Sequence, residues 1–277
     1  MRVVRPADLD EALAAMAEPD EAPVPVAGGT DLLVHWPERL EMRDRTFVDL
    51  WGLEELRPVE WSDDALVLGA RTTYWDVVTD PEVGRAFPLL VDAGRLVGAV
   101  QIQSRGTWAG NIVNGSPAAD GVPVLMAYDA EVELASTRGR RTVALDRFYS
   151  GYKEMDRRPD ELVVGIRLPR REHAFERFVK VGSRRAQAIA KVGLAVTRSD
   201  AGWRVVVASV APTIRRCRAV EEALDAGERF DEPEGWRDLL AEDVRPIDDL
   251  RSTAAYRERV LARVLHFALR EEEESHG

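Results

Sequence analysis

Two glycine-bearing loops contain the residues whose types and spacing suit the binding of phosphate groups. The first is Ala27-Gly28-Gly29-Thr30-Asp31, and the second is Gly106-Thr107-Trp108-Ala109-Gly110-Asn111. Glycine permits positive φ and lets backbone N–H groups converge on an anion without an intervening Cβ. The hydroxyl groups of Thr30 and Thr107 could donate to the same phosphates. A glycine-bearing turn also occurs as plain structure, so either loop alone is weak support for a phosphate site.

Asp120 ends the continuation of the second loop, Ser116-Pro117-Ala118-Ala119-Asp120. A carboxylate suits the hydroxyls of a ribose or ribityl chain better than it suits a phosphate. The helix expected over 122–128 follows directly, so capping of that helix is an alternative role for Asp120. The two roles are compatible, because a capping carboxylate can also accept from a sugar hydroxyl.

Several motifs of other catalytic and nucleotide-binding sites are absent from the sequence. It contains no G-x-G-x-x-G, P-loop, G-x-S-x-G or H-E-x-x-H pattern. Cys217 is the only cysteine, whereas an iron–sulfur cluster needs several thiolates. The four histidines show no metal-ligand spacing. Any metal chemistry is therefore expected on another chain.

Composition excludes two further classes of protein. The net charge is −11, which disfavours a nucleic-acid partner because phosphate backbones are also negative. No apolar run approaches the length of a transmembrane helix, and the N-terminal residues lack the apolar core of a signal peptide. We therefore expect a soluble, cytoplasmic protein that binds neither nucleic acid nor a membrane.

Periodicity divides the chain into three units that would position these loops, at 1–57, 58–171 and 172–277. The first unit has a helix over 8–17 and strands over 24–27 and 46–50. In the second, strands are expected over 66–70, 101–103, 131–135 and 162–168, with helices over 73–78, 88–97 and 122–128. The third contains a strand over 175–181, a hairpin of 192–196 and 204–210, helices over 217–224 and 235–240, and a long helix that Ser252 would cap.

The two loops together resemble the FAD-binding subunit of the xanthine dehydrogenase and carbon monoxide dehydrogenase family. The resemblance rests on Ala27–Leu32 followed by Gln101–Asn111. Three further segments fit the family in the same order, namely 116–120, 178–185 and 250–257. These matches span nearly the whole chain. They imply an α+β protein: a two-subdomain FAD-binding fold of the vanillyl-alcohol-oxidase/p-cresol-methylhydroxylase type plus a C-terminal α+β domain.

The resemblance also implies a set of cofactor-binding residues and no catalytic ones. One wall of the pyrophosphate site would be Val26, Ala27, Gly28, Gly29, Thr30, Asp31 and Leu32. The opposite wall would come from the loop of Gly106, Thr107, Trp108, Ala109, Gly110 and Asn111. Asp120 would accept from sugar hydroxyls, and Val97 and Val163 would make apolar contacts. Lys180 would lie near the isoalloxazine, where a positive charge stabilises the anionic reduced flavin.

Three of these residues have alternative interpretations. Lys180 follows apolar strand residues and could instead be an edge-strand lysine with its tip in solvent. Trp108 could contact the cofactor, although an anchoring role in the loop is favoured. Ala109 stands where the family usually has glycine, and alanine tolerates positive φ less well. It would weaken FAD binding if the loop required positive φ there, and would not if φ were negative.

The family implies a division of labour among subunits. A large subunit would carry the molybdenum cofactor and a small subunit would carry 2Fe–2S clusters, in a dimer of heterotrimers. This chain would be an oxidoreductase component that passes electrons from those clusters through FAD to an external acceptor. One alternative is a free-standing FAD oxidase of the vanillyl-alcohol-oxidase type. Another is a flavin-free assembly subunit, for which Ala109 is the only supporting feature.

Overall fold

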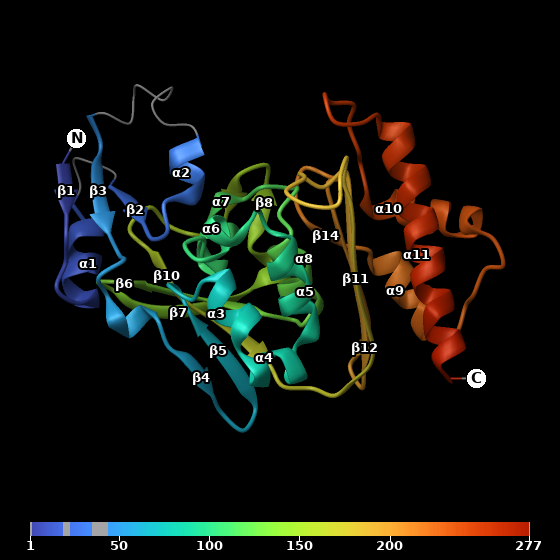
Figure 1. Cartoon of the computed structure of the whole chain (residues 1–277), viewed down its shortest axis with the longest axis horizontal. Coiled ribbons are helices and arrows are strands. Elements are labelled where there is room, and N and C mark those ends of the chain that lie inside the picture. The colour runs from blue at the N-terminus through green and yellow to red at the C-terminus, as the bar shows by residue number, and fades with distance from the viewer. Residues whose placement is uncertain (1, 19–22, 35–43, 277) are drawn as a thin grey trace.

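The first of the three larger sheets in the described residues is parallel and three-stranded. The computed structural model describes residues 2–18, 23–34 and 44–276. Strands β1 (Arg2–Val4), β3 (Thr46–Asp49) and β2 (Val24–Val26) lie side by side in that order, at the left of Figure 1. The amphipathic helix α1 (Leu9–Met16) buries its apolar face, and Asp8 caps it by accepting from the Glu11 N–H. Helix α2 (Thr30–Val34) follows β2 directly.

The second sheet is antiparallel and five-stranded, in the order β4-β5-β10-β6-β7. Its strands are β4 (Val59–Trp61), β5 (Ala65–Gly69), β6 (Glu131–Ser136), β7 (Gly139–Ala144) and β10 (Leu162–Pro169). The central strand β10 is buried almost throughout, because both of its faces are covered. The short hairpin of β8 (Tyr149–Gly151) and β9 (Glu154–Met155) forms a separate two-stranded sheet. The first two sheets share one apolar core.

Six short helices accompany the second sheet. They are α3 (Tyr74–Thr79), α4 (Pro81–Ala86), α5 (Pro88–Leu96), α6 (Val100–Gln103), α7 (Trp108–Asn114) and α8 (Gly121–Ala127). Among the described residues, short 3-10 helices occur at η2 (Glu54–Leu56), η3 (Leu145–Arg147) and η4 (Pro233–Trp236). Helix α7 packs on β10, whereas α5 and α8 contact the third sheet. The helices therefore form the layer between the second and third sheets (Figure 1).

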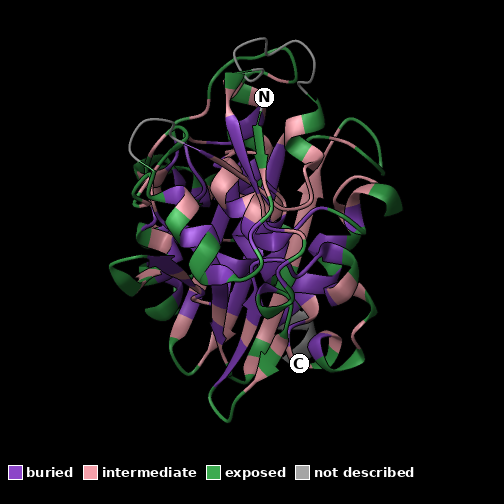
Figure 2. Ribbon diagram, turned by 90° about the vertical axis from the view of Figure 1, so that its left-hand side faces the viewer, coloured by how far each residue is buried: buried purple, intermediate pink, exposed green. Residues whose placement is uncertain are grey.

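The third sheet separates two apolar cores. Its strands are β11 (His173–Val181), β12 (Val192–Ser199), β13 (Gly202–Ala208) and β14 (Arg215–Arg216). Alternate side chains point to opposite faces, so Ala195 and Val206 join the core under α8 while Leu194 and Val205 join the core on the other face. That second core is closed by α9 (Arg218–Asp225), α10 (Arg237–Asp243) and α11 (Ala254–His276), and Figure 2 shows the buried residues running through the molecule.

Charged residues join the second and third sheets. The carboxylate of Asp129 lies 2.6 Å from Arg171 Nη1 and 2.7 Å from Arg204 Nε, and Arg216 lies 3.4 Å away. Asp129 adopts the left-handed region with φ of 52°, which aspartate tolerates better than most residues. The hydroxyl of Tyr128 donates to Glu176 on β11 at 2.6 Å. These contacts fix the helical layer against the third sheet.

The α+β architecture predicted from the sequence is confirmed, and two local predictions are wrong. Residues 101–103 form helix α6 rather than a strand, because Gly98 turns the chain with φ of 52° and Ala99 starts helical hydrogen bonding. Thr253, not Ser252, caps α11, since its hydroxyl accepts from the Tyr256 N–H at 3.2 Å. No helix among the described residues is long and apolar enough to cross a bilayer.

Candidate functional site

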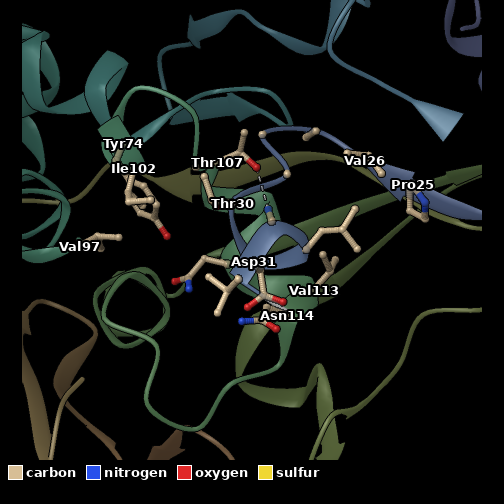
Figure 3. Close-up of a pocket in the computed structure, with 18 of the residues that line it drawn as sticks. Pro25, Val26, Thr30, Asp31, Tyr74, Val97, Ile102, Thr107, Val113 and Asn114 are labelled. Atoms are coloured by element: carbon tan, nitrogen blue, oxygen red, sulfur yellow. Dashed lines mark hydrogen bonds between the residues drawn. The ribbon is translucent and has the colours of Figure 1, made fainter. Parts of the chain in front are cut away.

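A cavity of about 640 Å³ lies between the first sheet and the helices of the second. One wall is the segment that runs from β2 into α2 and the other is formed by α6, α7 and the loop between them (Figure 3). The wall residues are Val24–Leu32, Val34, Tyr74, Val97, Ile102, Gly106, Thr107, Gly110, Asn111, Val113, Asn114, Lys153 and Met155. The two glycine-bearing loops thus face each other across one cavity.

The first loop owes its path to glycine. Gly29 has φ of 71°, which turns the chain out of β2 before Thr30 starts α2. The Gly29 carbonyl then accepts from the Leu33 N–H at 3.0 Å, as the helix requires. Because the loop is short, the backbone from Val26 to Asp31 lines the cavity directly.

The second loop is fixed by a helix cap. Thr107 is extended, and its hydroxyl oxygen accepts from the Gly110 N–H at 2.9 Å, which starts α7 (Figure 3). The segment just before α3 holds the loop in place. The Tyr74 N–H donates to the Gly106 carbonyl at 3.1 Å, and the Trp108 N–H donates to the Thr72 carbonyl at 3.2 Å. The second loop is therefore positioned by residues more than thirty positions earlier in the chain.

The two loops touch through their backbones. A Cβ added to Gly28 would lie 1.7 Å from the carbonyl oxygen of Arg105, a separation that no side chain can adopt. Only glycine permits this approach. The contact brings the backbones of both loops to the same end of the cavity.

Polar groups of the cavity wall suit a cofactor that carries both donors and acceptors. The Asn111 Oδ1 atom is buried and has no hydrogen-bond partner in the described structure, so it can accept from a ligand. The Tyr74 hydroxyl points into the cavity (Figure 3), and burial, assisted by the charge of Asp120, raises its pKa. Tyr74 is therefore a protonated donor at neutral pH.

Charge is sparse in the described part of the cavity wall. Lys153 and Asp31 are its only charged side chains, on the β8–β9 hairpin and on α2. Lys153 has φ of 58°, a left-handed conformation that is costly for lysine. It is the one lysine or arginine of this wall that can meet a negatively charged ligand.

Most of the residues predicted from the sequence line this cavity, and five do not. The residues brought together there are Val26, Ala27, Gly28, Gly29, Thr30, Asp31, Leu32, Val97, Gly106, Thr107, Gly110 and Asn111. Those outside the wall are Trp108, Ala109, Asp120, Val163 and Lys180. The assignment of the first group to one site agrees with this geometry.

Asp120 and Lys180 pair with each other. Lys180 Nζ lies 2.6 Å from Asp120 Oδ2 and donates to the Leu96 carbonyl at 3.0 Å. The side chains are only 7% and 14% exposed, so the interpretation of Lys180 as a lysine with its tip in solvent is wrong. Asp120 makes no side-chain hydrogen bond to the helix that follows it, so the capping interpretation is also wrong.

The remaining three residues are packed in the protein interior. Trp108 is fully buried, and its ring lies 4.9 Å from that of Tyr74, which agrees with an anchoring role. Ala109 lies in the first turn of α7 and is not among the residues with positive φ. Alanine therefore fits there without strain, and the argument for a flavin-free subunit loses its support. Val163 is buried in β10.

Sequence reasoning missed several wall residues. Tyr74, Val113, Asn114, Lys153 and Met155 belong to segments that carry no motif, and Ile102 lies in the matched segment Gln101–Asn111 but was not assigned to the site. The amphipathic spacing of α7 gave the available signal for Val113 and Asn114. Nothing local to Lys153 indicates that its hairpin reaches the cavity.

Comparison of the chain with known protein families identifies the class of protein to which this fold and cavity belong. A family model for the FAD binding domain in molybdopterin dehydrogenase matches residues 1–171, and one for the CO dehydrogenase flavoprotein C-terminal domain matches residues 177–271. Fold and site together define an FAD-binding flavoprotein with a C-terminal domain. More specifically, the chain belongs to the family of FAD-binding medium subunits of molybdopterin hydroxylases, of xanthine dehydrogenase and carbon monoxide dehydrogenase type, and it is an oxidoreductase subunit.

Individual relatives cover almost the full length of the chain. The putative xanthine dehydrogenase FAD-binding subunit of Escherichia coli (strain K12) is 32% identical over 91% of this chain and 89% of its own. The carbon monoxide dehydrogenase medium chain of Hydrogenophaga pseudoflava is 28% identical over 95% and 94%. A solved structure of reconstituted CO dehydrogenase from Oligotropha carboxidovorans superposes with a TM-score of 0.90, at 25% identity, over 98% and 96% of the two chains.

Proposed function

We propose that this chain holds FAD in the cavity between the two glycine-bearing loops and acts as the electron-transfer subunit of a molybdenum hydroxylase complex. The observation that carries the proposal is the convergence of both loops on one cavity in a chain of this family. Bound FAD would supply a carrier that accepts electrons from 2Fe–2S clusters of a partner subunit and releases them to an external acceptor.

The residues of the wall have distinct tasks in this proposal. Backbone N–H groups of the first loop around Gly28 would bind the diphosphate, with the hydroxyls of Thr30 and Thr107 as further donors. Asn111 and Tyr74 would bind polar atoms through the free Oδ1 and the protonated hydroxyl. The apolar side chains of Val97 and Ile102 would exclude water from a flat ring.

Asp120, Val163 and Lys180 would act on the cofactor site without lining it in the present geometry. Lys180 of the Asp120–Lys180 ion pair donates to the carbonyl of Leu96, which precedes the wall residue Val97. The negative charge of Asp120 also contributes to the raised pKa of Tyr74. The pair would set the electrostatic potential at that end of the cavity. Val163, Trp108 and Ala109 would support the wall from behind.

The partners follow from the names of the relatives. Relatives of this length are described as the medium chain of carbon monoxide dehydrogenase and as the medium subunit of nicotine 6-hydroxylase. We infer a large subunit with the molybdenum cofactor and a small subunit with 2Fe–2S clusters, assembled as a dimer of heterotrimers. The unit boundaries 1–57, 58–171 and 172–277 are supported by one main sheet in each unit.

Replacement of Gly29 by valine tests the diphosphate assignment. Gly29 has φ of 71°, so a β-branched residue distorts the loop although only Val26 lies near the added Cβ. Gly227→Val is the matched control, because Gly227 also has positive φ and open space but lies after α9. We expect Gly29→Val to lose FAD with an unchanged circular dichroism spectrum, while Gly227→Val keeps it. Retention of FAD by folded Gly29→Val contradicts the assignment.

A further inference from the structure

Trp51 stacks with two arginines, Arg105 next to the second loop and Arg71 just before α3. The indole of Trp51 follows β3 and is half-buried. The guanidinium carbon of Arg105 lies 3.6 Å from the centre of this ring and that of Arg71 lies 5.1 Å from it. Arg71 is itself buried and is held by Glu54 at 3.1 Å. Cations favour such positions over the negative face of an aromatic ring.

The stacked residues connect directly to the two glycine-bearing loops. The Leu50 N–H, just before Trp51, donates to the Val26 carbonyl at 2.8 Å, where the first loop begins. Arg105 immediately precedes Gly106, and its carbonyl oxygen is the atom that contacts Gly28. The ring contact between Trp51 and Arg105 and the backbone contact between Gly28 and Arg105 therefore join the same two segments.

We propose that the Trp51–Arg105 pair positions the two loops for the cofactor, as a pair of positioning residues outside the binding wall. The inference rests on the proposed function, because it concerns the FAD site. Neither residue lines the cavity, so neither would contact the ligand. No ion pair of the Arg105 guanidinium occurs among the described residues, which leaves its stacking on Trp51 as the evident task of this side chain.

The pair would affect FAD affinity because it holds the two loops in the arrangement that binding requires. The two walls come from segments far apart in the sequence, and a ligand that spans the cavity must be contacted by both at once. If the loops separate for part of the time, the apparent dissociation constant is the intrinsic constant divided by the competent fraction, so it rises with the fraction of molecules that are not competent to bind. A stacking contact next to the Gly28–Arg105 approach reduces that fraction. It therefore affects FAD affinity more than it affects folding.

Substitution of the pair separates positioning from general stability. We would prepare the full-length chain as wild type, Arg105→Gln, Arg105→Lys, Trp51→Leu and the double variant Trp51→Leu/Arg105→Gln. The matched control is Arg170→Gln, because Arg170 also stacks on a tryptophan, Trp61, at 5.4 Å but away from the loops. FAD dissociation constants and dissociation rates would be measured by flavin fluorescence. The thermal midpoint of each FAD-free protein would be measured in parallel.

The expected result is a weaker FAD complex with little change in the FAD-free protein. Loss of one exposed cation–π contact predicts an increase of about two- to fivefold in the dissociation constant, mainly through faster release. Arg105→Lys should retain most of the affinity because it keeps the cation. The double variant should be no weaker than the weaker single variant, since one contact is removed in all three. Arg170→Gln should bind like wild type.

Three outcomes would overturn the inference. The first is unchanged affinity in both single variants. The second is additive loss in the double variant. The third is an equal loss in Arg170→Gln, which would indicate a general effect of removing surface charge. A wild-type chain that binds no FAD at all would instead contradict the proposed function, so the two failures are distinguishable.

Discussion

Lys180 Nζ lies 2.6 Å from Asp120 Oδ2, across sixty residues of sequence and between the third sheet and the helical layer. Both side chains are largely buried, and Lys180 is also held by the Leu96 carbonyl. Burial raises the pKa of Asp120 from its ordinary value of 3.8 to about 6, and the charge and hydrogen bond of Lys180 oppose that rise. Asp120 and Lys180 thus form an ion pair in which the Asp120 carboxylate is protonated at a higher pH than an ordinary aspartate.

The raised pKa of Asp120 predicts a pH dependence of stability. Between pH 3.8 and about 6 the folded protein binds more protons at Asp120 than the unfolded chain does. The stabilising contribution is therefore complete below pH 3.8 and is lost as the pH rises through 6. A shift of this size corresponds to at most about 3 kcal/mol. Urea unfolding of wild type and Asp120→Asn at pH 4 to 7 measures it, and an identical pH slope in both proteins would contradict it.

Gly28→Ala should prevent FAD binding by separating the loops. Its methyl group would lie 1.7 Å from the Arg105 carbonyl oxygen, so one loop must move. We expect a loss of affinity of more than about tenfold, equivalent to more than about 1.4 kcal/mol. Gly52→Ala is the control, because no atom lies within 4 Å of the Cβ it would add. Normal FAD content in purified Gly28→Ala would show that the loop contact does not shape the site.

Lys153→Gly should change stability and affinity in opposite directions. Lysine at φ of 58° is strained, and glycine is not, so the FAD-free protein should gain up to about 1 kcal/mol. Removal of this wall cation should weaken FAD binding by about fivefold, the effect of a solvent-screened charge pair. Lys153→Arg keeps both the strain and the charge and should resemble wild type. Denaturant unfolding and fluorescence titration give the two values, and a loss of stability in Lys153→Gly would refute the strain argument.

Asp129→Asn should weaken the junction between the second and third sheets. Burial favours a higher pKa for Asp129, but Arg204, Arg171 and Arg216 together lower it below 3.8. The stability that its charge provides is therefore present above pH 3.8 and lost as the pH falls. Asparagine also tolerates the left-handed backbone, so the substitution isolates the charge.

We expect Asp129→Asn to lower the free energy of unfolding by about 1 to 3 kcal/mol at pH 7, because three arginines lose their shared carboxylate. Arg5→Gln, at an exposed 3.7 Å pair with Asp49, is the control and should have no measurable effect. Equal behaviour of the two variants in urea unfolding would show that the Asp129 cluster contributes nothing to the junction.

Elements with a repeated pattern could be predicted from the sequence. In the β12–β13 hairpin, Val192, Leu194 and Val196 alternate, a turn follows over 199–202 and the chain returns over 204–210, and the structure forms this hairpin. The α11 helix is also predicted by its periodicity, although its buried face in the structure is formed by Leu261, Leu265 and Leu269. By contrast, the three residues 101–103 alternate too briefly to distinguish a strand from a helical turn, and the positive φ of Gly98 decides the outcome.

The candidate site was predictable where glycine dictates the backbone. Gly28 shows the close approach and Gly29 the positive φ that glycine-bearing loops predict, and the resemblance implies the same loops as the cofactor site. The Asp120–Lys180 pair and the Trp51–Arg105 pair were not predictable, because each depends on how separate sheets pack. The sequence around each of these residues does not indicate the residue with which it pairs.

The central claim is that the chain carries FAD. An absorption spectrum of the purified full-length chain, with the released cofactor identified by chromatography, tests it most directly. The account predicts a yellow protein with one FAD per chain, released intact on denaturation and accompanied by no iron or molybdenum. A colourless protein that stays without flavin after incubation with excess FAD would contradict the account.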